Sequence, residues 1–313
     1  MEFVSDFDIL ISNFMAIVYD HISENKRKTA LLLGAFFVLI IGLGFVFSQA
    51  YGSPEILYIA VGFSICYALI SYYFSANITL SLSRAHAVDR SVAPELYQVI
   101  ENLCITAGLP TPKIYIIEDT ATNAFATGRN PQNAVIVFTT GILQKLNKTE
   151  LEGVAAHELS HIGNYDIRLM TLVVVLVGLL TLLADFFLRF SFYSRGGRSR
   201  NNQAQAIFMI AGIVLALLSP IIASFIQLAI SRKREFLADS SGTLLTRYPE
   251  GLASALEKIS QDTEPLEAAN KATAHLYIAN PLRNRHNSIG WFAGLFNTHP
   301  PIEERVRRLR EMT

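Results

Sequence analysis

The sequence predicts a mainly helical α+β protein that is integral to a membrane, and three observations lead to this fold class. Hydrophobic residues make up 51% of the 313 residues and charged residues only 17%, whereas about 25% of the residues in soluble domains are charged. Four apolar runs each have the length of about 20 residues with which a helix crosses a bilayer. Two short strand-like segments lie between the second and third runs.

The charge balance limits the classes of function. The chain has 26 Lys and Arg residues against 26 Asp and Glu residues, so its formal net charge is zero. A disordered chain needs a lower apolar content, and a protein that binds nucleic acid through bulk positive charge needs a basic excess. We therefore expect a lipid bilayer as the surroundings and no nucleic-acid partner.

The N-terminal residues 1–27 have the pattern of an amphipathic helix. We expect this segment to lie at a membrane surface or on the protein itself. Apolar residues recur there at helical spacing, namely Phe3, Phe7, Leu10, Phe14, Ile17 and Val18.

Residues 28–75 are predicted to form a transmembrane hairpin. Its apolar runs are Thr29–Phe47, which has no charge, and Ile56–Ser75. The sequence Lys26-Arg27-Lys28 precedes the first run, whereas the loop between the runs has no Lys or Arg. Basic residues mark the cytoplasmic side of a span, so the N-terminus and the chain after the second span are expected in the cytoplasm.

Residues 167–231 contain a second apolar helical hairpin, formed by Leu169–Leu188 and Ala206–Ser231. The connecting loop is rich in arginine, including Arg198, and a simple hairpin would place these cations outside. Either the positive-inside rule is violated here or these two helices do not cross the membrane fully.

Residues 76–166 and 232–313 have mixed polarity and are predicted to be soluble. In the first part we expect a helix at Ser91–Ala107, strands at Lys113–Glu118 and Ala134–Phe138, and a helix that begins at Thr149, where Thr149 and Glu152 fit a capping box. In the second part we expect helices at Arg232–Leu245, Glu250–Gln261 and Pro301–Arg310.

The predicted helix that begins at Thr149 contains the sequence His157-Glu158-Leu159-Ser160-His161. Residues four apart lie on one helix face, so both imidazoles can bind one ion. A catalytic zinc site has three protein ligands and one open position. Glu158 lies beside the imidazoles and is the expected general base. The motif therefore predicts a catalytic site with one zinc ion per chain.

The third ligand must come from another part of the chain. Glu235 is the best candidate, because Glu235 and Asp239 share a helix face and Asp239 can accept a hydrogen bond from a ligand imidazole. From spacing alone, an ordinary solvated charge cluster is the alternative for this pair. The other candidates are the remaining histidines, His21, His86, His275, His286 and His299.

Several segments together resemble the HtpX family of bacterial membrane zinc endopeptidases, which are relatives of the CAAX prenyl proteases. The segments are AAHELSHIGNYD at Ala155–Asp166 and SRKREFLAD at Ser231–Asp239, with an apolar hairpin between them. The sequences NAFATG at residues 123–128 and THPP at residues 298–301 extend the resemblance.

The resemblance implies a gluzincin-like catalytic core that faces the cytoplasm from the bacterial inner membrane. In such a core His157, His161 and Glu235 bind zinc and Glu158 is the base. The family is linked to heat shock and to quality control of membrane proteins, so the implied substrates are membrane or misfolded polypeptides. Residues 76–166 and 232–313 would then be two parts of one catalytic domain.

Two further motifs each have a functional and a structural interpretation. Asn123 and Ala124 resemble the zincin edge strand that pairs with an extended substrate, or Asn123 caps a local turn. His299 donates to the oxyanion of the tetrahedral intermediate, or His-Pro-Pro only begins the last helix. Surface or core-bracing charges are expected further on, at Glu303, Glu304 and Arg305.

Other functions remain open on the sequence alone. A narrow processing protease would share the same motif. A receptor with a structural metal would have a closed site, usually with Cys ligands, and Glu158 argues against it. A transporter would have ionisable groups at mid-span, whereas Asp185 is the one charge inside an apolar run and lies near the end of that run.

Overall fold

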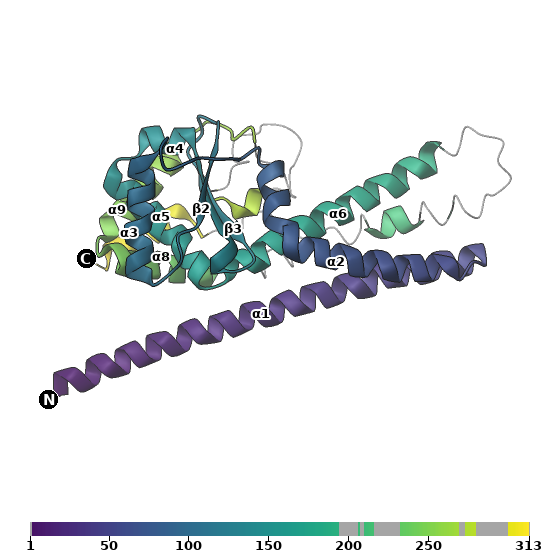
Figure 1. The fold of residues 1–313 in the computed structure, drawn as a ribbon, viewed down its shortest axis with the longest axis horizontal. Coiled ribbons are helices and arrows are strands. Elements are labelled where there is room, and N and C mark those ends of the chain that lie inside the picture. Colours follow the sequence, from purple (N-terminus) through teal and green to yellow (C-terminus); the bar gives the residue numbers. More distant parts are fainter. Residues whose placement is uncertain are drawn as a thin grey trace.

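The computed structural model describes residues 2–193, 206, 210–215, 232–268, 273–279 and 300–312. Most of this part of the chain is helical, with one small sheet, as the sequence predicts (Figure 1). The longer helices are α1 (Glu2–Tyr51), α2 (Glu55–Leu82), α3 (Pro94–Ala107), α5 (Lys148–Gly163), α6 (Asp166–Tyr193), α8 (Arg232–Thr246), α9 (Pro249–Gln261) and α11 (Ile302–Arg310). The remaining elements are strands β1 (His86–Ala87), β2 (Lys113–Ile117), β3 (Ala124–Gly128) and β4 (Ala134–Thr139), helix α4 (Thr140–Lys145), and the 3-10 turns η1 (Pro131–Asn133) and η3 (Ala274–Leu276).

Helices α2 and α6 and the C-terminal half of α1 form an apolar arm that projects from the globular part, while the N-terminal half of α1 runs below that part (Figure 1). Three stretches in them are long and apolar enough to cross a membrane, namely Ser23–Gln49, Glu55–Leu82 and Asp166–Phe187. Large apolar side chains on the arm are exposed, with Val38 at 75% and Ile59 at 70%, which suits contact with lipid. The predicted fourth helix, at Ala206–Ser231, lies largely outside the described residues.

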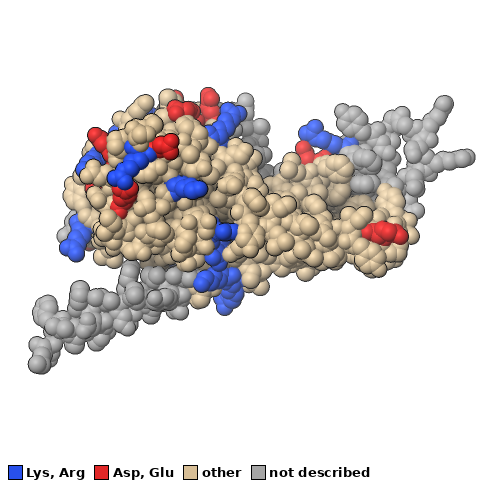
Figure 2. Space-filling view, in the orientation of Figure 1, with Lys and Arg blue, Asp and Glu red and all other residues tan. Residues whose placement is uncertain are grey.

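On the face shown in Figure 2, charged side chains gather on the globular part and its junction with the arm, and only a few lie at the end of the arm. Helix α1 is continuous over Glu2–Tyr51, so the predicted amphipathic segment and the first apolar run form a single helix. Its polar residue Asn25 is buried against the globular part. The first apolar helix therefore also contributes to the packing of the globular domain.

The sheet has the strand order β1-β2-β4-β3. Strands β2 and β4 are parallel, and both outer pairs are antiparallel. The two predicted strands are confirmed, apart from one residue at an end of each. Strand β3 lies at the edge of the sheet and pairs with β4 from Ala124 opposite Phe138 to Gly128 opposite Ala134.

Helices cover both faces of the sheet. Alternate residues of β4 point to opposite faces. Ile136 belongs to the core cluster that includes Leu159 of α5, and Val137 belongs to the cluster on the other face, which includes Val173 of α6. Helix α6 thus begins against the sheet and continues into the apolar arm. The sheet lies between the catalytic helix predicted from the sequence and the third apolar helix.

Two glycines allow helices to approach α5 closely. A Cβ at Gly242 of α8 would lie 3.0 Å from the backbone nitrogen of His157, and one at Gly153 of α5 would lie 2.6 Å from that of Leu252. Glu235 and Asp239 lie on the same face of α8 as Gly242, because the spacings are seven and three residues. This contact therefore brings both carboxylates to α5.

Candidate active site

Helix α5 begins one residue earlier than predicted, and the predicted capping box is wrong. Asn147 is the N-cap: its Oδ1 accepts a hydrogen bond from the backbone nitrogen of Glu150 at 3.0 Å. Glu150 Oε2 in turn accepts from the backbone nitrogen of Asn147 at 2.8 Å. The side chain of Thr149 only donates to Asn147. An Asn-x-x-Glu box two residues upstream thus replaces the predicted Thr-x-x-Glu box.

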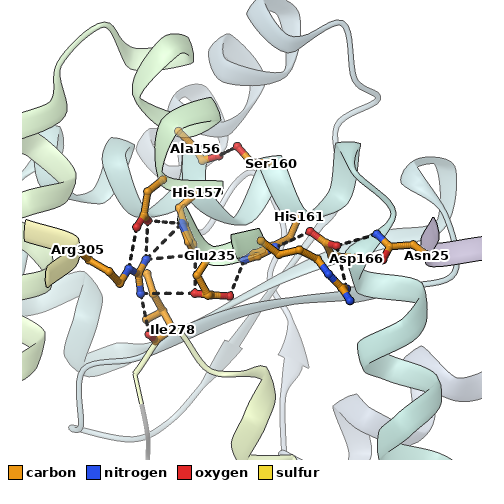
Figure 3. A network of polar contacts seen from close by, with 11 residues as sticks. Asn25, Ala156, His157, Ser160, His161, Asp166, Glu235, Ile278 and Arg305 are labelled. Atoms are coloured by element: carbon orange, nitrogen blue, oxygen red, sulfur yellow. Dashed lines mark hydrogen bonds and ion pairs between the residues drawn. The ribbon is translucent and has the colours of Figure 1, made fainter. Parts of the chain in front are cut away.

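His157, His161 and Glu235 converge in a buried cluster (Figure 3). The Nε2 atoms of the two imidazoles are 3.2 Å apart. Glu235 of α8 lies across from them, with Oε1 3.5 Å from His161 Nε2 and Oε2 3.8 Å from His157 Nε2. One ligand atom from each residue lies within 4.8 Å of the others, which is close enough for all three to hold one metal ion.

Each imidazole is held on its outer side by a carboxylate. Asp239 Oδ1 lies 3.0 Å from His157 Nδ1, and Asp166 Oδ2 lies 3.0 Å from His161 Nδ1. A carboxylate at Nδ1 favours the tautomer with its proton there, so Nε2 keeps a lone pair for an ion. Both inward nitrogens and a carboxylate therefore form a donor set that fits zinc.

Arg305 of α11 is a residue of this site that the sequence analysis did not assign to it. Its side chain is fully buried and donates to Asp239 from Nε at 2.9 Å and from Nη2 at 2.6 Å. Nη1 lies 3.6 Å from Glu235 Oε2, and Nη2 lies 3.4 Å from His157 Nδ1. The prediction of a surface charge is wrong for this residue, and the alternative, a core-bracing charge, is correct.

Arg305 has a signal in the sequence. Ile302, Val306 and Leu309 are buried on α11, and Arg305 shares their helix face because the spacings are three, one and four residues. A cation on the apolar face of a short helix needs a buried anion. The acidic residues near the metal motif, Asp239 among them, were the available partners.

Burial and neighbouring charges shift the pKa values of this site in different directions. Burial raises the pKa of Glu158 to about 7, and the charge of Glu235 adds to the rise. Burial also lowers the pKa of His157 to about 4, with a contribution from the cation Arg305. For His161, burial is outweighed by the hydrogen bond to Asp166 and by the charge of Glu235, so its pKa rises to about 9.

The predicted substrate strand, at Asn123 and Ala124, lies at the edge of the sheet, and part of its outer side is already paired. Ile278 donates its backbone N–H to the Ala124 carbonyl at 3.0 Å. The Asn123 side chain donates to the Ala279 carbonyl at 3.1 Å and accepts from the Ala279 nitrogen at 3.4 Å. Asn123 therefore joins β3 to the segment at residues 277–279.

Two of the other candidate ligands lie away from the metal-binding cluster, and the remaining three lie outside the described part of the chain or have side chains that do. His86 is exposed near Glu118, and His275 is buried with Nε2 3.3 Å from the Met170 carbonyl. His286 and His299 lie outside the described residues, as does the side chain of His21. Among the described residues, only His157, His161 and Glu235 form a cluster that could hold a metal.

Paired imidazoles beside a buried carboxyl group suit metal-assisted hydrolysis, and comparisons with known proteins give the same class, the metalloproteases. The model of Peptidase family M48 matches residues 90–313, so the chain belongs to this family. A protein of Dictyoglomus turgidum named Protease HtpX homolog is 46% identical over 298 residues, which are 94% of each chain. A protein of Tropheryma whipplei with the same name is 42% identical over 296 residues, 95% of this chain and 99% of the other.

These relatives confirm the resemblance to the HtpX family that the sequence motifs indicate. The chain is thus a protease with apolar helices long enough to span a membrane. Among solved structures, the crystal structure of S. mikatae Ste24p aligns with a TM-score of 0.49 and 19% identity, over 92% of this chain and 66% of that chain.

Proposed function

We propose that the chain is a membrane-embedded, zinc-dependent endopeptidase that hydrolyses peptide bonds of misfolded or membrane proteins and takes part in membrane protein quality control. The observation that carries this proposal is the convergence of His157, His161 and Glu235 beside the buried Glu158. Membership of Peptidase family M48 and the relatives named Protease HtpX homolog support the class of reaction.

The proposed zinc ligands are His157, His161 and Glu235. Zinc in catalytic sites takes such a set and keeps one position open. When bound, zinc supplies a Lewis acid that polarises the scissile carbonyl and lowers the pKa of water. Asp166 and Asp239 orient the two imidazoles by accepting at Nδ1.

Glu158 is the proposed general base. Its carboxylate takes a proton from the attacking water as the new C–O bond forms, and it passes that proton to the leaving amine as the C–N bond breaks. Burial raises the pKa of this carboxyl group, which favours its acceptance of a proton from water. A backbone hydrogen bond from Ala126 of β3 acts on the same carboxyl group and favours its ionised form.

We place the substrate backbone along the outer side of β3, at Asn123 and Ala124, because extended peptides add to sheet edges through backbone hydrogen bonds. Ile278 and Ala279 occupy these positions in the structure, so a substrate has to replace them. His299 is the proposed donor to the oxyanion, on the basis of the THPP motif alone.

The proposed topology has five parts. Residues 1–27 and the hairpin at 28–75 lead into the catalytic domain, whose parts at 76–166 and 232–313 are separated by the second apolar hairpin at 167–231. One ion needs ligands from both parts, so both lie on one side of the membrane. The basic residues Lys26, Arg27 and Lys28 favour the cytoplasmic side of the inner membrane.

The proposal is tested by measuring zinc content and proteolysis of an unfolded protein and a membrane protein with purified variants. Glu158→Gln should keep zinc and lose about 10²- to 10⁴-fold in rate, as expected for removal of a general base. Glu235→Ala should lose zinc and activity together, because two histidines are too few ligands for a catalytic site.

Glu152→Gln is the matched control, since Glu152 is a partly exposed glutamate on the same helix. It should retain zinc content and activity. Near-normal turnover by zinc-loaded Glu158→Gln would refute the assigned base. Full zinc occupancy in Glu235→Ala would refute the ligand set.

A further inference from the structure

We propose that Asn25, at the start of the first apolar span, is a positioning residue for the metal site that acts on the ligand His161 through Asp166. The inference rests on the proposed function, since it takes His161 as a zinc ligand. It gives α1 a role in the catalytic centre in addition to that of a membrane helix.

The relevant contacts lie at the corner between α5 and α6, formed by Asn164, Tyr165 and Asp166. Helix α5 carries the metal motif and ends at Gly163, and α6 begins at Asp166. Tyr165 has φ of 61°, a left-handed conformation that is uncommon for a residue other than glycine. The corner is therefore a tight turn that needs support from outside the two helices.

Asn25 supplies this support with both hydrogens of its amide group. Its Nδ2 donates to the Asn164 carbonyl at 3.0 Å and to Asp166 Oδ1 at 2.8 Å. The residue is 2% exposed, so its amide is desolvated and its donors are satisfied at this corner. In Figure 3 the side chain reaches from α1 to Asp166, on the side away from Arg305.

Asp166 connects Asn25 with the proposed metal ligand His161. Its Oδ1 accepts from Asn25 and from Arg234 Nη1, the latter at 3.2 Å, while its Oδ2 lies 3.0 Å from His161 Nδ1. Two donors on one oxygen fix the plane of the carboxylate, and that plane sets the direction of the imidazole. A change at Asn25 therefore alters the orientation of His161 without touching it.

A second contact also joins α1 to this corner. Lys26, the next residue of α1, lies with Nζ 5.3 Å from the centre of the Tyr165 ring, and Arg168 of α6 lies 5.1 Å from the same ring. Cations at these distances are attracted to an aromatic face. The membrane span that includes Asn25 begins at Ser23, so displacement of α1 in the bilayer would act on Asp166 directly.

The test uses the full chain in detergent micelles and measures the zinc dissociation constant by competition with a chelator. Asn25→Ala should weaken zinc binding about three- to tenfold, less than the about 10- to 100-fold expected of Asp166→Asn, which contacts the ligand itself. Thr29→Val is the matched control, because the Thr29 hydroxyl, also buried on α1, donates only within its own helix, to the Asn25 carbonyl. It should leave zinc binding unchanged.

A double-mutant cycle identifies the route. If Asn25 acts through Asp166, adding Asn25→Ala to Asp166→Asn should weaken zinc binding no further. Independent, additive effects would overturn the route through Asp166. Unchanged zinc binding in Asn25→Ala, with thermal unfolding of the zinc-free protein lowered, would overturn the inference, because it is the result of a purely structural role.

A second variant and a comparison of zinc content distinguish the possible reasons for a negative result. Asn25→Ser also lacks the amide and should show the same loss if Asn25→Ala does not fold. If the wild type holds no more zinc than His161→Ala, both the proposed function and this inference fail. If the wild type holds zinc through His161 and the Asn25 variants match it, only the inference fails.

Discussion

The two histidines of the site are held from opposite sides, and the two supports differ in chemistry (Figure 3). His157 is held by Asp239 with Arg305, which we call the Asp239 support. His161 is held by Asp166 with Arg234 and Asn25, which we call the Asp166 support. Arg305 donates to Asp239 from two nitrogens and also contacts His157. On the other side, Arg234 Nη1 lies 3.2 Å from Asp166 Oδ1, and the shorter contact to this oxygen, at 2.8 Å, comes from the neutral amide of Asn25.

The two imidazoles also differ in the charges that surround them. Arg305 lies close enough to lower the pKa of His157, in addition to the effect of burial. His161 is surrounded by carboxylates, and its pKa is raised to about 9. The Asp239 support belongs to the globular part, while the Asp166 support includes Asn25 of the apolar helix α1. The contacts behind the two imidazoles therefore come from different parts of the molecule.

The largest effect is expected when the cation of the Asp239 support is removed. Arg305→Met leaves Asp239 and Glu235 buried without their guanidinium partner, and loss of one member of a buried ion pair costs about 3–5 kcal/mol. The free energy of unfolding of the zinc-free protein in detergent, measured with denaturant, should fall by that amount.

Arg310→Met is the control for this variant. Arg310 also makes two ion pairs, with Glu250 and Glu257, but it is 45% exposed. Exposed pairs contribute up to about 1 kcal/mol, so its loss should be small. Equal destabilisation by the two variants would contradict the view of Arg305 as a buried brace.

The second prediction compares the two carboxylates directly. Asp239→Asn and Asp166→Asn each replace the charged partner of one imidazole with an amide of the same shape, and each should weaken zinc binding about 10- to 100-fold. Zinc should still bind when supplied in excess, in contrast to Glu235→Ala. Chelator competition on both variants checks this expectation, and a loss confined to one of them would show that only one support matters.

The inner part of the site could be predicted from sequence because it depends on local spacing. His157, Glu158 and His161 lie within one helix turn and a half, and Glu235 and Asp239 lie on one face of another helix. The two helices bring their side chains together because α8 approaches α5 closely at Gly242. Residue spacing within each helix does not reveal this approach. The resemblance to a known family supplied that link.

The outer part could not be predicted, because it depends on contacts between distant segments. Asn25 and Asp166 are 141 residues apart, and nothing in an apolar run identifies its flanking Asn as a partner of a carboxylate. Arg305 shares the apolar face of α11, unlike the exposed Arg307 and Arg308, and this position indicates burial but does not identify Asp239 as its partner. The error in the cap of α5 has a local cause, since Asn147 and Thr149 both suit an N-cap and each is followed three residues later by a glutamate.

The smallest effect is expected at the other end of α5, which carries a further buried carboxylate, that of Glu150, but no candidate metal ligand. Glu150 accepts hydrogen bonds from Ser254 at 2.6 Å, Lys258 at 2.7 Å and the backbone of Asn147 at 2.8 Å. Glu150→Gln should lower the free energy of unfolding by about 1 kcal/mol, because the neutral amide loses the ion pair with the partly exposed Lys258. Zinc binding should not change, because both supports of the site remain intact.

The pH dependence of unfolding tests whether Glu150 stabilises the fold in its ionised form. Burial alone would raise the pKa of Glu150, but its hydrogen bonds to Lys258 and Ser254 outweigh burial and lower it below the ordinary 4.5. A carboxyl group with a lowered pKa in the folded state stabilises the fold above its unfolded pKa and loses this contribution as the pH falls through the folded value. The difference in unfolding free energy between wild type and Glu150→Gln should therefore be constant above about pH 5 and shrink in more acidic solution. A difference that grows on acidification would show that Glu150 is held in its neutral form, and a parallel loss of zinc would show that the cap of α5 is coupled to the metal site.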